Sequence, residues 1–449
     1  MILPSVLDVF KIGIGPSSSH TLGALKSGLF FRNRISGCDL TNSSVEVELC
    51  GSFALTGKGH LTDIAVVCGL NGLDVEKEGE RFLEIYKTIT DRGYIDINGF
   101  KIPFNPDKNI VWNKSFKNLS HPNTVRYRLM KNGTVIDKQE YHSIGGGMLE
   151  KETTNRNINE KARDFKDLNE IIAFCKKNGM DFVKFSDFFE EETYFNNKES
   201  INEQLKKRWK IMKQRIEKGL KTKGTLPGVL KLQRRAAKMF DEYVKNLRLW
   251  RMLLEEVTLT SIYAIAVAEE NADGALIVTS PTSGSSGVLP AVLRTIQEKY
   301  RFGDDKIIDA MKVAGLIGSV VIKNGSIAGA QVGCQGEIGV ACSMAAASAC
   351  YLMDGTMEQI EFAAEIGLEH HLGLTCDPVA GLVQIPCIER NGAAAVSALN
   401  AANLALLSRA KHQISFDNAV KTMMEIGKDM NKKYKETSLG GLASIYKSR

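Results

Sequence analysis

Three cysteines in the last third of the chain are placed as metal ligands often are. Cys334 follows a glycine, Cys376 leads into an Asp-Pro pair, and Cys387 comes directly after a proline. A thiolate offered to a metal needs backbone N–H groups and a turn around it, because a sulfur charge buried in an apolar helix face is costly. Their placement at turns therefore favours ligation over packing for these three thiols.

Two further cysteines in the same stretch indicate a core position instead. Cys342 and Cys350 lie in ACSMAAASAC, where helical spacing puts small apolar residues on buried faces. The three candidate ligands do not form a tight C-x-x-C pair, and free cysteine is among the most buried residue types. Spacing alone therefore leaves structural thiols and a metal site equally open.

Two glycine-flanked turns near the N-terminus carry groups for acid–base chemistry. The segment GIGPSSSHTLG at 13–23 resembles an anion-binding loop, because glycines let N–H groups approach a ligand and hydroxyls precede a helix start. Serine and threonine also cap ordinary helices. His60 lies in TGKGH and could act as a base, although a lone histidine is more often a packed or surface group. His20 is the competing candidate.

A third loop and a histidine pair offer weaker signals. The hydroxyls and glycines of 281–287 could cradle a phosphate, which would suit pyridoxal phosphate, but we find no lysine in a recognisable Schiff-base setting. The adjacent pair His370 and His371 could bind a metal, yet neighbouring helical residues point about 100° apart. Packing is the simpler interpretation of this pair.

Phrases spread through nearly the whole chain resemble, in the same order, the iron–sulfur L-serine dehydratases of bacteria, of the single-chain type. Two of them, CQGEIGVACSMAAA and GLTCDPVAGLVQIPCIERN, contain the three candidate ligands. The others are GIGPSSSHTLG, GSFALTGKGHLTD, SIGGG, GTLPGVLKLQRRA, PTSGSSGVLPAVL and KYKETSLGGLA. Long matches in register are far more specific than any single short motif.

The resemblance implies a cofactor and a reaction. It implies that Cys334, Cys376 and Cys387 hold a [4Fe-4S] cluster, which leaves one iron open as a Lewis acid for the hydroxyl of L-serine. It places the base that removes the α-proton at His60, with pyruvate and ammonia as products. The side chains expected to hold the amino acid are Ser17, Ser19, His20, Ser143 and Thr282.

Other interpretations stay open at this point. The same elimination could act on L-cysteine or L-threonine, or could use pyridoxal phosphate. A protein that is not an enzyme, such as an amino-acid-sensing module with structural zinc on the three cysteines, is a further alternative. Some members of the family end in a cysteine that caps the open iron, but no cysteine follows Cys387. We therefore do not expect capping by the tail.

Length and composition indicate a soluble globular protein of two or three domains. The chain has 449 residues, of which 43% are hydrophobic and 24% charged. Its apolar stretches are too short to span a bilayer, and its N-terminus lacks the pattern of an export signal. Nine cysteines without regular spacing fit a reducing compartment better than a disulfide scaffold. We expect a cytoplasmic protein.

The net charge of +6 is unevenly distributed. Residues 201–250 contain fifteen Lys or Arg against four Asp or Glu, a local charge of +11 that leaves −5 for the remainder. The basic residues recur at helical intervals and few aromatic residues interleave, so a solvated helical face is favoured over nucleic-acid binding. The expected partners are L-serine and a second copy of the chain in a homodimer, without nucleic acid or membrane.

Periodicity predicts an α+β N-terminal domain followed by a larger all-α domain. Strands are expected at 45–49 and 94–97, and an Asn-Gly turn predicts a hairpin between 125–129 and 134–136. With helices over 19–31 and 62–70, these strands make residues 1–150 a domain for substrate binding or regulation.

Polar residues 151–200 are interpreted as a connecting segment and 201–449 as the iron–sulfur catalytic domain. Its predicted helices span 201–218, 229–246, 252–271, 306–321, 335–352, 357–372, 391–410 and 416–434. Because the base and the cluster ligands come from different domains, catalysis should require both domains to close on one cleft.

Overall fold

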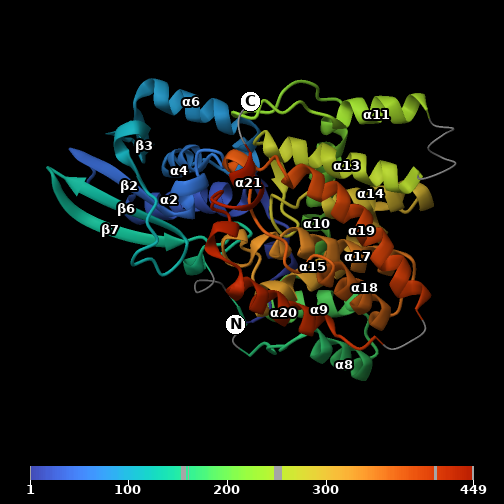
Figure 1. Ribbon diagram of the computed structural model, residues 1–449. Helices are drawn as coiled ribbons and strands as arrows, with labels where there is room; N and C mark the ends of the chain where they lie inside the picture. The colour runs from blue at the N-terminus through green and yellow to red at the C-terminus, as the bar shows by residue number, and fades with distance from the viewer. Residues whose placement is uncertain (1, 153–157, 160, 247–254, 409–411, 447–449) are drawn as a thin grey trace.

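The computed structural model describes residues 2–152, 158–159, 161–246, 255–408 and 412–446. Strands and short helices gather on one side of the molecule, and long helices form the other (Figure 1). We call residues 2–152 the N-terminal part and the described residues from 161 onward the helical part. The predicted α+β domain followed by a larger helical domain is confirmed, and within the described residues the helical part adds one strand, β8 (Leu276–Val278).

The main sheet of the N-terminal part has the strand order β5-β2-β6-β7. Its strands are β2 (Ser43–Gly51), β5 (Ile110–Asn113), β6 (Asn123–Lys131) and β7 (Thr134–His142). Strand β2 runs antiparallel to β6 and parallel to β5, and β6 and β7 form the predicted hairpin. Alternate residues of β2 are buried against helices, as the period-two pattern predicts. A second, two-stranded sheet pairs β3 (Tyr94–Ile97) with β4 (Phe100–Pro103).

Helices α2, α4 and α6 lie beside the main sheet, and shorter turns connect the strands (Figure 1). The helices of the N-terminal part are α1 (Val6–Val9), α2 (Gly23–Ile35), α3 (Ser52–Thr56), α4 (Thr62–Leu70), α5 (Val75–Glu78), α6 (Phe82–Arg92) and α7 (Pro106–Asn109), with the short turns η1 (Ser18–Leu22), η2 (Gly79–Arg81) and η3 (Glu150–Glu152). The strands and the two helices predicted here are confirmed, although β7 continues six residues beyond the predicted end at 136.

The helical part is built around α17 (Ile338–Leu352), whose alanine-rich faces are almost entirely buried. Small side chains let α14, α15, α18 and α19 pack closely around it. Cys342 and Cys350 are fully buried in this core, as predicted. The helices and short turns of this part are α8 (Leu168–Asn178), α9 (Phe182–Tyr194), α10 (Lys198–Gly219), α11 (Ala236–Lys245), α13 (Glu255–Ala272), α14 (Val288–Tyr300), α15 (Asp304–Asn324), α16 (Gly329–Val332), η4 (Gly333–Gly336), α17, α18 (Met357–Glu369), η5 (Val379–Gly381), α19 (Cys387–Leu407), α20 (Phe416–Asp429), η6 (Lys432–Tyr434) and α21 (Gly441–Ile445).

All eight helices predicted for the helical part are present, with shifted ends. Residues 252–254 and 409–410 of two predicted helices lie outside the described residues. Helix α14 was not predicted; its Pro290 lies in the first turn, where proline is tolerated. The segment over 165–194, interpreted as part of the connection, contributes buried phenylalanines such as Phe165 and Phe185 to the core. The predicted domain boundaries themselves remain a prediction.

The two parts share one core because the start of the chain packs into the helical part. Strand β1 (Ile12–Ile14) pairs antiparallel with β8, with Ile12 opposite Val278. Helix α1 packs on α15 just before this strand. The first fourteen residues therefore tie the N-terminal part to the helices that carry the cysteines.

Several residues of the basic segment at 201–250 form ion pairs within the chain. Arg234 Nη1 donates to Glu270 Oε1 at 2.7 Å, and Arg215 Nη1 lies 3.7 Å from Glu270 Oε2. On the surface of α10, Lys213 pairs with Asp304 at 2.9 Å. These contacts join α10 and the segment before α11 to α13 and to the start of α15.

Within the described residues, no single helix is both long and apolar enough to cross a membrane. Helix α15 and residues Gly329–Gly336 are long and apolar enough only when taken together, and the chain bends by 58° between them. Most of α15 is buried in the core of the protein.

Candidate active site

The loop before η1 brings His20 into the interior of the protein. The Ser17 hydroxyl accepts a hydrogen bond from the His20 N–H at 3.2 Å and caps this turn. From the helical part, the Asn271 side chain of α13 donates to the Pro16 carbonyl at 2.9 Å. The loop is thus fixed from both sides, and His20 is fully buried.

Main-chain hydrogen bonds hold His60 in place, and none of them uses its imidazole ring. Its N–H donates to the Thr56 carbonyl at 3.1 Å, and its carbonyl accepts from the Thr21 hydroxyl at 2.7 Å. A side chain at Gly59 would come within 2.2 Å of the Gly381 carbonyl, so only glycine allows this turn to contact the helical part. The His60 ring is buried, and within the part of the chain that the structure describes its Nδ1 has no hydrogen-bond partner.

Both ring nitrogens of His20 lie close to polar groups of neighbouring residues. Its Nε2 lies 3.0 Å from the Ser52 hydroxyl, and its Nδ1 lies 3.2 Å from Glu436 Oε1. The Ser52 hydroxyl donates its own proton to the Glu436 carbonyl at 2.7 Å. The hydroxyl must therefore accept from His20, which puts the imidazole proton on Nε2 and leaves Nδ1 facing the carboxyl of Glu436.

Burial sets the protonation of this cluster. It lowers the pKa of His20 and of His60 to about 3, so both imidazoles are neutral at pH 7. Their ring centroids are 4.5 Å apart. Burial also raises the pKa of the Glu436 carboxyl, which fits a protonated acid facing the bare Nδ1 of His20. The group combines two neutral imidazoles with a carboxyl that holds its proton more tightly than usual.

The three cysteines reach the same place from three separate turns of the helical part. Cys334 lies in η4, which leads into α17, and Cys387 is the first residue of α19. Cys376 is held by the C-terminal segment, because its N–H donates to the Tyr434 carbonyl and its carbonyl accepts from the Glu436 N–H, each at 2.8 Å. The backbone pairing of Cys376 therefore also places Glu436.

A buried carboxyl lies among the thiols. Glu337 Oε2 is 3.8 Å from Cys334 Sγ and 3.9 Å from Cys376 Sγ. Burial raises the pKa of Glu337, and the hydroxyl of Thr282 opposes that shift through a hydrogen bond. Burial likewise raises the pKa of the Cys387 thiol. These groups stay protonated unless a cation replaces their protons.

Arg390 brings a positive charge to this cluster. The guanidinium of Arg390 donates to the Thr375 carbonyl at 2.6 Å and lies 3.5 Å from Asp377. Its charge opposes the upward shift of the Cys387 pKa. Arg390 thus favours the thiolate form that a metal needs.

The histidines and the thiols meet at one small buried cavity. It is lined by Pro16, Ser17, His60, Gly284, Cys334, Glu337, Ile338, Cys376, Pro378, Val383, Cys387 and Glu436. A side chain at Gly329 would lie 2.9 Å from Glu337 Oε2 and 3.1 Å from Cys376 Sγ, so the adjoining backbone leaves this space to the site. Three convergent sulfur donors beside an arginine fit a thiolate-bound metal or cluster.

The predicted site residues divide into two groups. Ser17, His60 and the three cysteines line the cavity, and Thr282 and His20 contact residues that line it. Ser143 and Ser19 do not line it; the Ser143 hydroxyl donates to the Ser19 carbonyl at 3.0 Å and braces the turn that carries His20.

Four residues of the site were not predicted from the sequence, namely Glu337, Glu436, Ser52 and Arg390. All four lie inside phrases that carry the family resemblance, namely CQGEIGV, KYKETSLGG, GSFALTGKGHLTD and CIERN. Because glutamate is rarely buried, its position within such a phrase was the available signal.

Comparisons with known proteins match both halves of this site. Residues 126–443 match the family described as serine dehydratase alpha chain, and residues 5–154 match serine dehydratase beta chain. The L-serine dehydratase of Haemophilus influenzae is 40% identical over 453 residues, covering 98% of each chain. That of Streptomyces coelicolor is 40% identical over 455 residues, again covering 98% of each chain. That of Helicobacter pylori is 38% identical over 457 residues, covering 99% of each chain.

Proposed function

The chain belongs to the serine dehydratase family, and we propose that it is an L-serine ammonia-lyase that converts L-serine to pyruvate and ammonia. The observation that carries this proposal is the shared cavity: His60 comes from the part that matches the beta chain, the three cysteines come from the part that matches the alpha chain, and both line one buried space. A base and a set of metal ligands that face one cavity are the two requirements for removing an α-proton and a β-hydroxyl.

We further propose that Cys334, Cys376 and Cys387 hold a [4Fe-4S] cluster. Support comes from the convergence of the three thiols, from the nearby Arg390, and from the absence of a side chain at Gly329. When bound, such a cluster supplies a Lewis acid that makes the β-hydroxyl a better leaving group.

His60 is the proposed base for the α-proton. Its pKa is low enough to keep the ring neutral, its Nδ1 has no hydrogen-bond partner among the described residues, and, unlike His20, it lines the cavity. His20 contacts Ser52 and Glu436 through its two nitrogens, which suits a positioning role. After proton transfer to His60 and departure of the hydroxyl, aminoacrylate remains, and it tautomerises and hydrolyses to pyruvate and ammonia.

Several hydroxyls are proposed to position the amino acid. Ser17 lines the cavity and Thr282 contacts Glu337, so both can reach a bound amino acid. Ser19 and Ser143 are proposed to act indirectly by fixing the turn of His20. Ile338, Pro378 and Val383 provide apolar walls that exclude water from the reacting atoms.

We also propose that the protein is cytoplasmic and acts as a homodimer. All nine cysteines are free thiols, which supports a reducing compartment. Leu404 and Leu407 are exposed near the end of α19 and offer an apolar surface to a second copy. Light scattering of the purified protein tests the dimer, and a monomer at micromolar concentration would exclude it.

The decisive experiment is purification without oxygen, followed by analysis of iron and sulfide together with pyruvate formation from L-serine. We expect about four irons and four sulfides per chain, a brown colour, and turnover. Colourless protein with bound zinc would favour the sensing module. A yellow protein that loses its absorbance and activity with borohydride would favour pyridoxal phosphate. L-Threonine and L-cysteine, assayed in parallel, define the substrate.

A further inference from the structure

A hollow of about 410 Å³ lies at the seam between the two parts, outside the active site. We call it the basic hollow. Its lining consists of Phe116, Leu119, Pro122, Ala330, Gln331, Val332, Met424, Gly427, Lys428, Lys432, Lys435 and Thr437. One wall is thus the loop between β5 and β6 of the N-terminal part. The other is formed by α16, the end of α20 and the segment that follows α20.

Three lysines, Lys428, Lys432 and Lys435, line this hollow. Their ammonium groups form no ion pair or hydrogen bond with the described residues. The negative charge of Asp429 acts on Lys435 and partly offsets the lowering of its pKa. Partial burial and the charge of Lys432 both lower the pKa of Lys435, so the converging charges repel one another. An anion in the hollow would relieve this repulsion.

The remaining lining is largely apolar. Phe116, Leu119 and Pro122 come from the N-terminal part, and Val332 and Met424 from the helical part. A concave site with apolar walls and converging charges on one side is typical of pockets for small organic ligands. The lysines favour a ligand with a carboxylate or phosphate group, and the apolar walls favour a ligand whose remaining part is a hydrocarbon.

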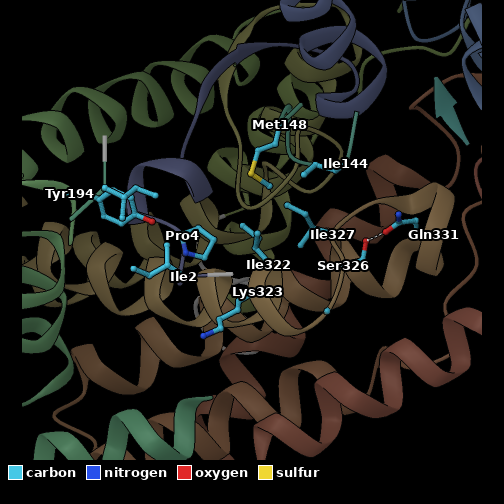
Figure 2. A pocket seen from close by; sticks show the side chains of 12 residues that line it. Ile2, Pro4, Ile144, Met148, Tyr194, Ile322, Lys323, Ser326, Ile327 and Gln331 are labelled. Atoms are coloured by element: carbon cyan, nitrogen blue, oxygen red, sulfur yellow. Dashed lines mark hydrogen bonds between the residues drawn. The ribbon is translucent and has the colours of Figure 1, made fainter. Parts of the chain in front are cut away.

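A neighbouring hollow provides an internal contrast. Figure 2 shows it, with Ile2, Met148 and Ile327 among its apolar side chains. Its volume is about 230 Å³, and its lysine, Lys323, already contacts Asp164 and the Phe165 carbonyl. The lysine of this second hollow is therefore already engaged, unlike those of the basic hollow.

The basic hollow adjoins the residues that brace His20. The Pro122 carbonyl accepts from the Ser52 N–H at 3.0 Å, and Lys435 precedes Glu436 in the chain. Ser52 and Glu436 are the two groups that contact the ring of His20. A ligand that touches both walls would hold these two groups in register across the seam.

We propose that the basic hollow binds a small organic anion, with a carboxylate or phosphate head against Lys428, Lys432 and Lys435 and a short apolar body against Phe116 and Met424. Its binding steadies the seam on which Ser52 and Glu436 meet. The binding step is independent of the proposed lyase activity, since neither the cysteines nor His60 line this hollow.

Calorimetry on the full-length, iron-loaded protein without oxygen tests the binding. Phenyl phosphate, benzoate and inorganic phosphate serve as probes: the first two share one body with different heads, and the third lacks a body. The variant Lys428→Gln/Lys432→Gln should bind the preferred probe about tenfold more weakly. The control Lys421→Gln/Lys433→Gln removes the same charge from exposed positions outside the hollow and should change the affinity less than about twofold.

Further arms separate the contributions of head and body. Phe116→Ala should weaken phenyl phosphate or benzoate but leave inorganic phosphate unchanged. Saturable binding of the preferred probe should also slow amide hydrogen exchange at Ser52 and across 430–437. Absence of saturable binding by all three probes at millimolar concentration would overturn the proposal. So would equal weakening in the two double variants, or binding without slower exchange at the seam. None of these readouts requires turnover.

Discussion

The two sides of the active-site cavity respond to burial in opposite ways. On the side of the N-terminal part, burial lowers the pKa of His20 and His60 to about 3 and so keeps both rings in the neutral form that a base requires. On the side of the helical part, burial raises the pKa of Cys387 and Glu337 and so keeps them from the anionic form that a metal requires. Burial therefore gives the histidines the protonation state that catalysis needs, and it keeps the thiols and Glu337 in the protonated state that does not bind a metal.

This difference separates what the protein does alone from what a metal completes. The histidine side is organised by hydrogen bonds within the chain, such as the contact between Ser52 and His20. The thiol side gains its charged form when a cation replaces the protons, and Arg390 already favours that exchange. We therefore expect substitutions on the thiol side to remove the cofactor and those on the histidine side to spare it.

The largest effect is expected for Cys376→Ser. Loss of one of three sulfur ligands should abolish both the retained iron and the formation of pyruvate, because the hydroxyl is a far weaker metal ligand. Iron analysis and activity on the same anaerobic sample measure this. Cys38→Ser, at an exposed cysteine far from the site, is the control and should keep both. Normal iron content in Cys376→Ser would refute the ligand assignment.

His60→Ala should separate the two sides most sharply. We expect turnover to fall by about 10²- to 10⁴-fold, the usual contribution of a positioned base, while iron content and visible absorbance stay unchanged. His20→Asn should cost less, because the amide keeps one polar contact with Ser52 or Glu436. Near-normal turnover in His60→Ala, with a severe loss in His20→Asn, would move the base to His20.

Stability should fall between pH 7 and pH 5 through a third buried histidine, His121, at the seam. Its Nδ1 accepts from the Asn123 N–H at 3.0 Å, and its Nε2 lies 3.0 Å from the side chain of Gln331. Burial lowers its pKa to about 4. Between about pH 6.5 and pH 4, His121 is protonated in the unfolded chain but neutral in the folded chain. The free energy of unfolding therefore decreases as the pH falls through this range.

The expected loss from this histidine at pH 5 is about 2 kcal/mol. Urea unfolding of the cofactor-free protein at both pH values measures it, and His121→Gln should show a correspondingly smaller drop. His370→Gln, at an exposed position, should keep the full drop. Identical pH dependence in wild type and His121→Gln would show that His121 does not couple folding to protonation.

Ser52→Ala is expected to have the smallest effect. It removes the hydroxyl that accepts from His20 and donates to the Glu436 carbonyl, two neutral hydrogen bonds across the seam. Turnover should fall about fivefold with iron unchanged, in line with about 1 kcal/mol for such contacts. Combining Ser52→Ala with Glu436→Gln should give less than the product of the two single effects, since both act on His20.

Local patterns predicted most of the fold. The Asn132-Gly133 turn, the alternation along β2 and the helical periods after residue 200 each report a short-range preference, and each is confirmed. Two features depend on distant partners and could not be read locally. The pairing of β1 with β8 joins segments more than 260 residues apart, and the phenylalanines of 165–189 pack into a core that polar neighbours conceal in the sequence.

The site was predictable in part for the same reason. Cysteines at turns and a histidine directly after a glycine-rich turn are unusual enough to stand out. The structure brings Cys334, Cys376, Cys387 and His60 to one cavity, although their roles remain predictions. Glu436 stood out less, because a glutamate next to lysine is ordinary surface sequence and only its place in the phrase KYKETSLGG marked it. Its burial arises from the backbone pairing with Cys376, which only the folded chain reveals.

The pairing of Ile12–Ile14 with Leu276–Val278 has a consequence for how the chain is made. During translation, β1 leaves the ribosome long before β8 has been synthesised. The edge of β1 therefore stays unpaired while more than half of the protein is made. The N-terminal part therefore reaches its final structure only after β8 has emerged. The catalytic cavity forms only after the later helices have been synthesised.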